Sequence, residues 1–575
     1  MSQEMVVSQT KSPGSDLSPE TKTGLPYSPL CEFNSIRSRV LNQVVERTAR
    51  DFDRAPLDLV LGEALYTEKI RIKRSHDNIF TKKRTQADRR LWGSIQSGLL
   101  KPSAELDRKE LLQQVLAHYT EEIGGHFDPR VYKFATGVIP YGFNWLLNAA
   151  SVKHFMPWKQ TESITKQLMI GGETEHLRKL AQKGTILLVP THQSNIDSIL
   201  IGYIIYLLGL PPFAYGAGLN LYMNPLLTFF MGNLGAYTVD RRKSNAIYKQ
   251  TLKNYSTAIL REGVHSIFFP GGGRSRSGAI ESKLKLGLMG TALEAQTQNL
   301  IEGREKPNVY IVPMVMSYHY VLEAGSLIED YLAEAGKHRF IITDDESFQP
   351  FKVANFFWRL FSGHSKISVR IGKPLDVFGN LVDEEGRSIG PNGTTIDPKA
   401  WLTTRGALKA DEQRDREYTL RLGGKLVDRF HRENTVLASH AVAFAYFETL
   451  RKQYPGLDLY RFLRLSSAQR SNPKERFYHE CMELETRLRR RERQGELHLS
   501  EEFTNFETWV NEGVRQLGQM HEAAVIKIAE DTVSTDDMTL LYYYRNRLAG
   551  YGLSVRADEL RGIRMGQHDE QGFLA

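Results

Sequence analysis

The segment TILLVPTHQSNID, Thr185–Asp197, decides the fold. Its first six residues form a short apolar run with β-branched positions, the pattern of a buried strand. An apolar helical pattern, SILIGYIIYLLGL, follows directly after Asp197. Because active groups of open α/β sheets gather at the carboxyl ends of strands, the polar turn that holds His192 and Asp197 is a candidate site.

The same alternation of short apolar runs and helical patterns continues on the C-terminal side. Further strands are predicted at 212–217, 235–240, 265–270, 309–318 and 366–372. Strands that alternate with helices indicate an α/β layer structure. We therefore predict an α/β domain over residues 160–380, and no internal repeat is found.

The flanks have a different character from this central region. Segments such as RKELLQQVLAHYTEEI and NTVLASHAVAFAYFETLRKQY carry apolar residues at helical spacing. The N-terminal residues are rich in Ser, Thr, Pro and Gly and lack the apolar core of a signal peptide. The organisation we expect is a disordered tail at 1–30, a helical N-terminal domain at 31–159, the α/β domain, a linker or surface excursion at 381–415, and a helical C-terminal region at 416–575.

Composition restricts the class of protein. The chain has 575 residues, of which 41% are hydrophobic and 25% charged, with a net charge of +8. This is an ordinary globular composition, and the mild basic excess suits anionic partners. The two cysteines, Cys31 and Cys481, are too few and too far apart for a disulfide framework or a Cys-based zinc site, and they fit a reducing, cytoplasmic compartment.

One stretch, residues 198–239, contains no charged residue. Its longest helical pattern, Ile199–Leu210, has 12 residues and stops at Pro211 and Pro212. At 1.5 Å per residue it reaches roughly 18 Å, whereas a bilayer core is about 30 Å thick, so a simple span is excluded. Two interpretations remain open: a buried helix and strand of the core, or an apolar wall for a greasy substrate or one membrane leaflet.

Three predicted strand ends carry the chemistry. The first bears His192 and Asp197, which a turn must bring together if the carboxylate is to orient the imidazole as a base. The second bears Arg241, and the third is FFPGGGRSRSG, with Arg274 and Arg276 after three glycines. Guanidinium groups and glycine-exposed N–H groups suit a phosphate. The loop lacks both G-x-G-x-x-G and the Walker pattern, so it is not expected to bind a nucleotide. No aromatic residues are interleaved with the arginines, so nucleic acid is not expected as a partner either.

Four blocks together resemble the glycerolipid acyltransferase superfamily, and most closely its glycerol-3-phosphate and dihydroxyacetone-phosphate acyltransferases. THQSNID matches the H-x-x-x-x-D motif, GAYTVDR the second motif, FPGGGRSRSG the third, and YIVPMVMSY, with Val312 and Pro313, the fourth. The resemblance implies a mixed sheet flanked by helices. It also implies that His192 is the general base and Asp197 its orienting partner.

The resemblance further implies that Arg241, Arg274, Ser275 and Arg276 hold the acceptor phosphate. Gly271, Gly272 and Gly273 are supporting positions, but the family has Glu where this chain has Gly271. Either the chain has compensated elsewhere, or the residue has been substituted, or the enzyme is weakened. The retained His, Asp and arginines favour an active protein.

The expected reaction is transfer of a fatty acyl group from acyl carrier protein or acyl-CoA to the sn-1 hydroxyl of glycerol 3-phosphate. Dihydroxyacetone phosphate and lysophosphatidate are alternative acceptors. A non-catalytic lipid- or membrane-surface-binding protein is the alternative of another class. No metal or other cofactor is expected, and the protein is expected at the cytoplasmic face of an anionic membrane or in the cytoplasm.

Overall fold

The computed structural model describes residues 28–74, 82–101, 105–137, 167–218, 229, 231–335, 366–519, 521 and 523–554. The predicted boundary between residues 159 and 160 lies outside these ranges. So does most of the predicted N-terminal tail. Its last residues, however, are folded, because a 3₁₀ helix starts at Pro29 and the Leu30 side chain is buried against Gly235.

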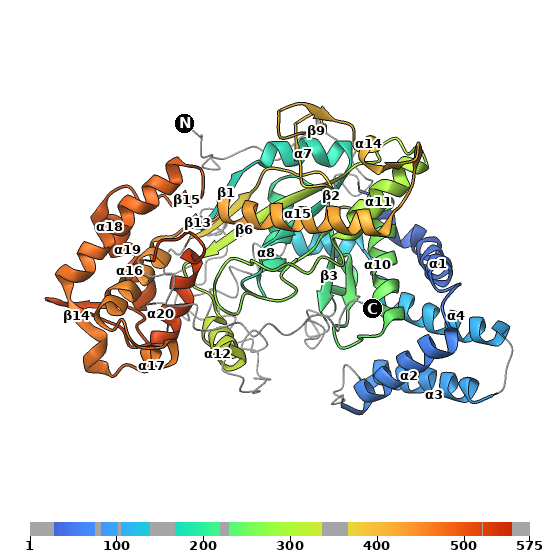
Figure 1. Ribbon diagram of the computed structural model, residues 1–575, viewed down its shortest axis with the longest axis horizontal. Helices are drawn as coiled ribbons and strands as arrows, with labels where there is room; N and C mark the ends of the chain where they lie inside the picture. The colour runs from blue at the N-terminus through green and yellow to red at the C-terminus, as the bar shows by residue number, and fades with distance from the viewer. Residues whose placement is uncertain are drawn as a thin grey trace.

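A seven-stranded mixed sheet forms the centre of the molecule (Figure 1). The β6–β7 pair is antiparallel and every other neighbouring pair is parallel. This arrangement confirms the predicted mixed α/β fold. In spatial order the strands are β1 (Leu168–Gly172), β7 (Ile367–Ile371), β6 (Val309–Tyr318), β2 (Thr185–Pro190), β5 (Ser266–Ile267), β3 (Ala214–Gly218) and β4 (Ala236–Val239).

The strands that are predicted best from the sequence are the ones with long buried apolar runs. All ten residues of β6 and all six of β2 are buried, as expected of central parallel strands covered on both faces. Edge strand β1, LMIGG, was not predicted because a short segment ending in two glycines has the composition of a turn. Strand β5 is shorter than its predicted range, because the chain turns away into a loop after Ile267.

Helices surround this sheet (Figure 1). Helix α15 packs against β6 and α11, and α10 packs against α11. Helix α8 ends at Leu207, just before Gly209 with φ +65° and the Pro211–Pro212 pair, and its buried residues include Leu200, Ile201 and Ile204. The bounds are α7 (Thr174–Lys183), α8 (Asp197–Leu207), α10 (Ala246–Arg261), α11 (Gly290–Ile301), α12 (Ala324–Ala335) and α15 (Glu412–Arg432).

Helix α8 and strands β3 and β4 of the charge-free stretch therefore belong to the core; residues 219–228 and 230 lie outside the described ranges. Among the described helices, none combines the length and the apolarity needed to cross a bilayer.

The N-terminal helices form a bundle that packs on α10. A buried ionic cluster joins the bundle to the loop after β4. Lys243 from that loop contacts Glu122 and lies 3.6 Å from Asp88, which Arg71 also binds. The helices are α1 (Phe33–Asp51), α2 (Leu57–Arg74), α3 (Lys82–Leu99) and α4 (Glu105–Ile123).

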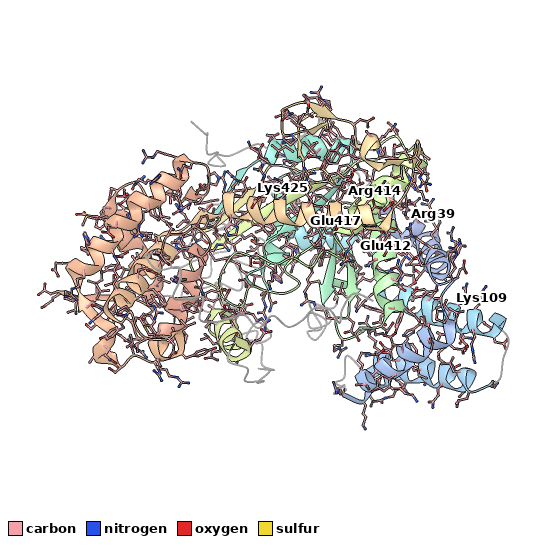
Figure 2. All side chains as sticks on the ribbon, viewed as in Figure 1. Arg39, Lys109, Glu412, Arg414, Glu417 and Lys425 are labelled. Carbon is pink, nitrogen blue, oxygen red and sulfur yellow. The ribbon has the colours of Figure 1, made fainter. Side chains whose placement is uncertain are left out.

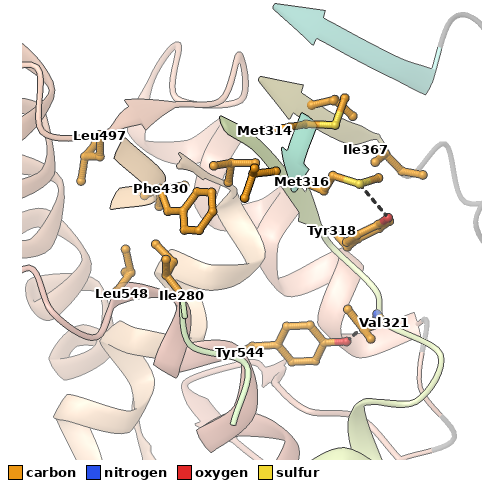
Figure 3. Close-up of a cluster of buried hydrophobic side chains, with 14 of the residues drawn as sticks. Ile280, Met314, Met316, Tyr318, Val321, Ile367, Phe430, Leu497, Tyr544 and Leu548 are labelled. Carbon is orange, nitrogen blue, oxygen red and sulfur yellow. Dashed lines mark hydrogen bonds between the residues drawn. The ribbon is translucent and has the colours of Figure 1, made fainter. Parts of the chain in front are cut away.

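The C-terminal region shares one continuous core with the sheet. Its central helix α16 is buried over residues 438–450, between α18, α19 and α20. Figure 3 shows residues of both parts in contact, and the Val321 backbone N–H donates to the Tyr544 hydroxyl at 3.0 Å. The helices are α16 (Ala438–Gln453), α17 (Leu459–Leu463), α18 (Lys474–Arg493), α19 (Phe506–Gln519) and α20 (Met538–Arg545).

Small sheets of two or three strands complete the described fold. In residues 381–415, the short strands and α14 form a folded segment in which Leu402 is buried. The elements are β8 (Leu381–Val382), β9 (Ser388–Ile389), β10 (Thr395–Ile396), α14 (Pro398–Leu402), β11 (Thr403–Thr404), β12 (Ala407–Leu408), β13 (Thr435–Val436), β14 (Ser471–Pro473), β15 (His498–Leu499), β16 (Lys527–Ala529) and β17 (Thr532–Ser534).

Candidate active site

The candidate residues lie where strands β2, β4 and β5 end. These strands belong to the parallel part of the sheet, so their carboxyl ends meet at one edge. The loop after β5 is tied to the loop after β2 by a backbone hydrogen bond, because Ser275 N donates to His192 O at 2.7 Å. The sheet thus brings the base and the arginine-rich loop together.

His192 and Asp197 form the predicted pair. His192 Nδ1 lies 2.8 Å from Asp197 Oδ2, and a turn closed by the bond from Asp197 N to Ser194 O makes this approach possible. The Asp197 side chain is 0% exposed and that of His192 is 16% exposed. Because the carboxylate accepts the Nδ1–H, the imidazole keeps Nε2 available as a base; Nε2 has no hydrogen-bond partner among the described residues.

Three further donors hold the Asp197 carboxylate. Oδ2 accepts from the backbone N–H groups of Gln193 at 2.7 Å and Ser194 at 3.0 Å. Oδ1 accepts from the Tyr318 hydroxyl at 2.5 Å. Burial and the neighbouring carboxylate raise the pKa of Tyr318 well above its ordinary value, so the phenol remains a donor. Sequence reasoning missed Tyr318, although it is the last residue of the fourth block.

We expect Tyr318→Phe to lower the rate constant of the reaction catalysed at this site by about tenfold. Losing the donor leaves one buried Asp197 oxygen unsatisfied, which costs about 1–3 kcal/mol, and weakens the hold on the imidazole. Steady-state kinetics on each candidate acceptor measures the effect. Tyr310→Phe is the matched control, because Tyr310 lies on the same strand but its hydroxyl donates to Gly386 O. Equal losses in both variants would contradict the role of Tyr318.

Arg241 and Arg274 lie close enough to each other for their charges to interact. Arg241 makes no ion pair with any carboxylate in the described ranges, and its side chain is exposed. Although the residue as a whole is accessible to solvent, partial desolvation of the guanidinium and repulsion by Arg274 lower the pKa of Arg241. A Cβ at Gly273 would lie 3.5 Å from Arg241 Nη1, an ordinary contact distance, so the guanidinium lies beside the glycine loop. Two neighbouring cations in this arrangement favour an anion between them.

Glu323 holds Arg274 and the turn after His192. Arg274 Nη1 lies 3.4 Å from Glu323 Oε1, and the Glu323 carboxylate is fully buried. It also accepts from Ser194 Oγ at 2.8 Å and from Asn195 N at 3.1 Å. Burial raises the pKa of Glu323, while the Arg274 charge opposes this shift. Glu323, which sequence reasoning missed, therefore links the arginine pair to the base.

Ser275 and Arg276 are engaged elsewhere. The Ser275 hydroxyl donates to Ala279 O at 2.6 Å, and Arg276 pairs with Glu334 at 2.7 Å on the exposed surface. Only the backbone of Ser275 reaches the base. The structure thus brings together His192, Asp197, Arg241 and Arg274, whereas the Ser275 hydroxyl and the Arg276 guanidinium point to other partners.

The supporting positions have structural roles. Val312 and Pro313 lie in β6 opposite Leu188 and Val189 of β2, so they underlie the loop that carries the base. Gly272 has φ +69°, a conformation that favours glycine, and a Cβ there would lie 2.8 Å from the stem of Lys285. Both features fix the path of the glycine loop.

Residues of the C-terminal region bind strand β6 and the arginine-rich loop. Buried Arg547 donates to Met316 O and to Asn434 Oδ1, each at 2.7 Å. Asn546 Nδ2 donates to Ser277 O at 3.0 Å, which holds the end of the arginine-rich loop. A Cβ at Gly278 would lie only 2.3 Å from Tyr543 O. No local sequence signal marks these residues, since their partners are far away in the chain.

Among the described residues, side chains of the types that ligate metals are grouped at one place. Asp88, His118 and Glu122 lie close together in the N-terminal bundle. The Lys243 ammonium contacts Glu122 and lies 3.6 Å from Asp88, so a side-chain cation already neutralises this cluster. The cluster is therefore explained as a buried ion-pair network.

Residues 173–317, which contain the first three motif blocks and all but the last residue of the fourth, match the family model described as Acyltransferase. The fold and the site thus define an acyltransferase domain. Three similar curated proteins are glycerol-3-phosphate acyltransferases. The protein from Colwellia psychrerythraea is 28% identical over 47% of this chain and 31% of its own length. That from Aeromonas hydrophila is 30% identical over 37% and 24%, and that from Histophilus somni 34% over 27% and 19%.

These matches show that residues 173–317 are similar to an acyltransferase domain, and that this part of the chain resembles glycerol-3-phosphate acyltransferases. The matched region spans about a third or less of the length of these three relatives. The similarity therefore covers only part of each relative, and the names of the relatives do not establish the activity of this whole chain.

Proposed function

We propose that this protein transfers a fatty acyl group from a thioester to the sn-1 hydroxyl of glycerol 3-phosphate, which gives lysophosphatidate. The observation that carries the proposal is the His192–Asp197 pair beside the Arg241–Arg274 pair. A base next to an anion site suits an acceptor that carries both a hydroxyl and a phosphate. The names of the curated relatives point to the same acceptor.

In this mechanism His192 Nε2 takes the proton of the acceptor hydroxyl as its oxygen attacks the thioester carbonyl. The carbon–sulfur bond then breaks, the thiol leaves with a proton returned from the imidazolium, and the ester remains on the acceptor. Asp197 keeps the Nδ1–H in place and stabilises the imidazolium. The ring of Phe269, with its centroid 4.3 Å from that of His192, covers one face of the base.

The acyl donor is proposed to be acyl carrier protein or acyl-CoA, both of which are anionic and suit a basic protein. We also propose that the protein works at an anionic membrane surface, where its lipid product belongs. Three of the five arginines at 487–493 are neutralised by carboxylates, because Arg487 pairs with Glu480, Arg489 with Glu485 and Arg491 with Glu496. Only Arg490 and Arg493 of this run are exposed, so it supplies less free positive charge than its sequence indicates. The basic segment near Ile70 lies partly outside the described residues.

The decisive experiment incubates the protein with each acyl donor and each of three acceptors: glycerol 3-phosphate, dihydroxyacetone phosphate and lysophosphatidate. Lipid analysis should show the largest kcat/KM for glycerol 3-phosphate. A preference for another acceptor would correct the substrate. No transfer to any acceptor, together with binding to anionic vesicles, would favour a non-catalytic lipid-binding protein.

We expect Arg241→Ala to raise KM for glycerol 3-phosphate with little change in kcat. A charge-assisted hydrogen bond contributes about 1.5–3 kcal/mol, which corresponds to about 10- to 150-fold in binding. Arg241 gives a cleaner test than Arg274, whose removal leaves the buried Glu323 carboxylate without its cation. Initial rates over a range of acceptor concentrations measure the change.

Arg242→Ala is the matched control for this variant. Arg242 is the next residue, but its guanidinium binds Asp240 through Nε and Nη2, each at 3.0 Å. Its loss should leave KM close to the wild-type value. If Arg241→Ala behaves in the same way, Arg241 does not bind the phosphate.

A further inference from the structure

Position 271 is a glycine because another side chain fills its space. A Cβ on Gly271 would lie 3.0 Å from Glu281 Cγ and 3.4 Å from Glu281 Oε1. The backbone of Gly271 is outside the positive-φ region in which glycine is favoured, so its conformation would accept a side chain. The φ of Gly271 therefore does not restrict this position, whereas the Glu281 side chain and, at 3.3 Å, the Gly273 carbonyl oxygen do.

The Glu281 carboxylate is bound to the residue that carries the base. Its Oε1 accepts the backbone N–H of His192 at 2.8 Å. Its Oε2 is inaccessible and has no hydrogen-bond partner among the described residues. Burial raises the pKa of Glu281, and the charges of Arg547 and His192 oppose this shift. A buried carboxylate oxygen without a hydrogen-bond partner lowers the stability of the folded protein. A carboxylate kept beside the base at this cost therefore indicates a function in the site.

We propose that Glu281 is a positioning residue of the acyl-transfer site, which supplies the carboxylate that the family's third motif carries at the position of Gly271. This inference rests on the proposed function. Through His192 N, Glu281 fixes the backbone of the base and, with Asp197, sets the direction of the imidazole. Its charge also lies near the ring that becomes cationic during proton transfer. The chain has thus compensated for the missing motif carboxylate.

The test exchanges the two positions. Glu281→Ala should lower kcat by up to about 10²-fold, the effect of a base displaced by about 1 Å, with KM for glycerol 3-phosphate unchanged. Gly271→Glu should also lower kcat, because the added side chain meets Glu281. The double variant Gly271→Glu/Glu281→Ala should recover about tenfold of the rate that Glu281→Ala loses, since residues in contact are not additive. A purely structural role predicts no such recovery.

Glu480→Ala is the control for the loss of a buried carboxylate. Glu480 lies on α18 and pairs with Lys452 and Arg487, so its removal should lower stability but not kcat. Thermal unfolding of every variant separates the two effects. Wild-type kcat in Glu281→Ala, or a double variant slower than both single variants, would overturn the role of Glu281 alone.

If wild type transfers no acyl group to any acceptor, the proposed function fails and Glu281 loses its assignment with it. If Glu281→Ala is too unstable to assay, the double variant decides. A folded, active double variant supports the exchange, and an inactive one overturns it.

Discussion

We expect His192→Ala to abolish acyl transfer to glycerol 3-phosphate within the sensitivity of a labelled-acyl assay. A positioned general base contributes about 10²- to 10⁴-fold. Asp197 is bound by four donors and has no free direction toward an acceptor. The rate that remains in His192→Ala should therefore be only the rate that results from holding the two substrates next to each other.

The loss should be confined to the chemical step. Glycerol 3-phosphate binding, measured by calorimetry, should stay near the wild-type value because Arg241 and Arg274 remain. His479→Ala is the control, since His479 is 69% exposed on α18. Full activity in His192→Ala would reject the catalytic assignment, whereas parallel loss of binding and activity would indicate a collapsed loop.

The sequence predicted the parts of the site that are local. Strand β2 has the bounds expected from its apolar run, because Gly184 precedes it and a polar turn follows. The turn that brings His192 to Asp197 was required by their spacing and is present. The mixed sheet agrees with the resemblance, because the four motif blocks lie in or beside its buried strands.

The rest depends on contacts between distant parts of the chain. Tyr318 and Glu323 bind the turn from His192 to Asp197 from positions more than 120 residues further along the chain. Arg547, near the C-terminal end of the described residues, binds the backbone of Met316. Glu281 is only ten residues from Gly271, but no periodicity marks a loop residue that folds back on a glycine. The direction of each arginine side chain also depends on its partner. Arg276 stands at a motif position, but its guanidinium pairs with Glu334 at the surface.

Asp197→Asn should lower kcat by about 10²- to 10⁴-fold while the protein remains folded. The amide keeps one oxygen, which can still accept from His192 Nδ1 and from the backbone of Gln193 and Ser194. Its NH₂ group then faces the Tyr318 oxygen, which can act as an acceptor. The hydrogen bonds can therefore be kept, but the negative charge that stabilises the imidazolium is lost.

Asp376→Asn is the control that separates charge at the site from loss of a buried acceptor. Asp376 is also buried, and it accepts from Phe378 N at 2.9 Å and from Asn380 N at 2.8 Å in the turn that follows β7. Its substitution should lower the melting temperature and leave kcat unchanged. Near-wild-type kcat in Asp197→Asn would mean that Asp197 only shapes the turn, and that the imidazole acts without help from its charge.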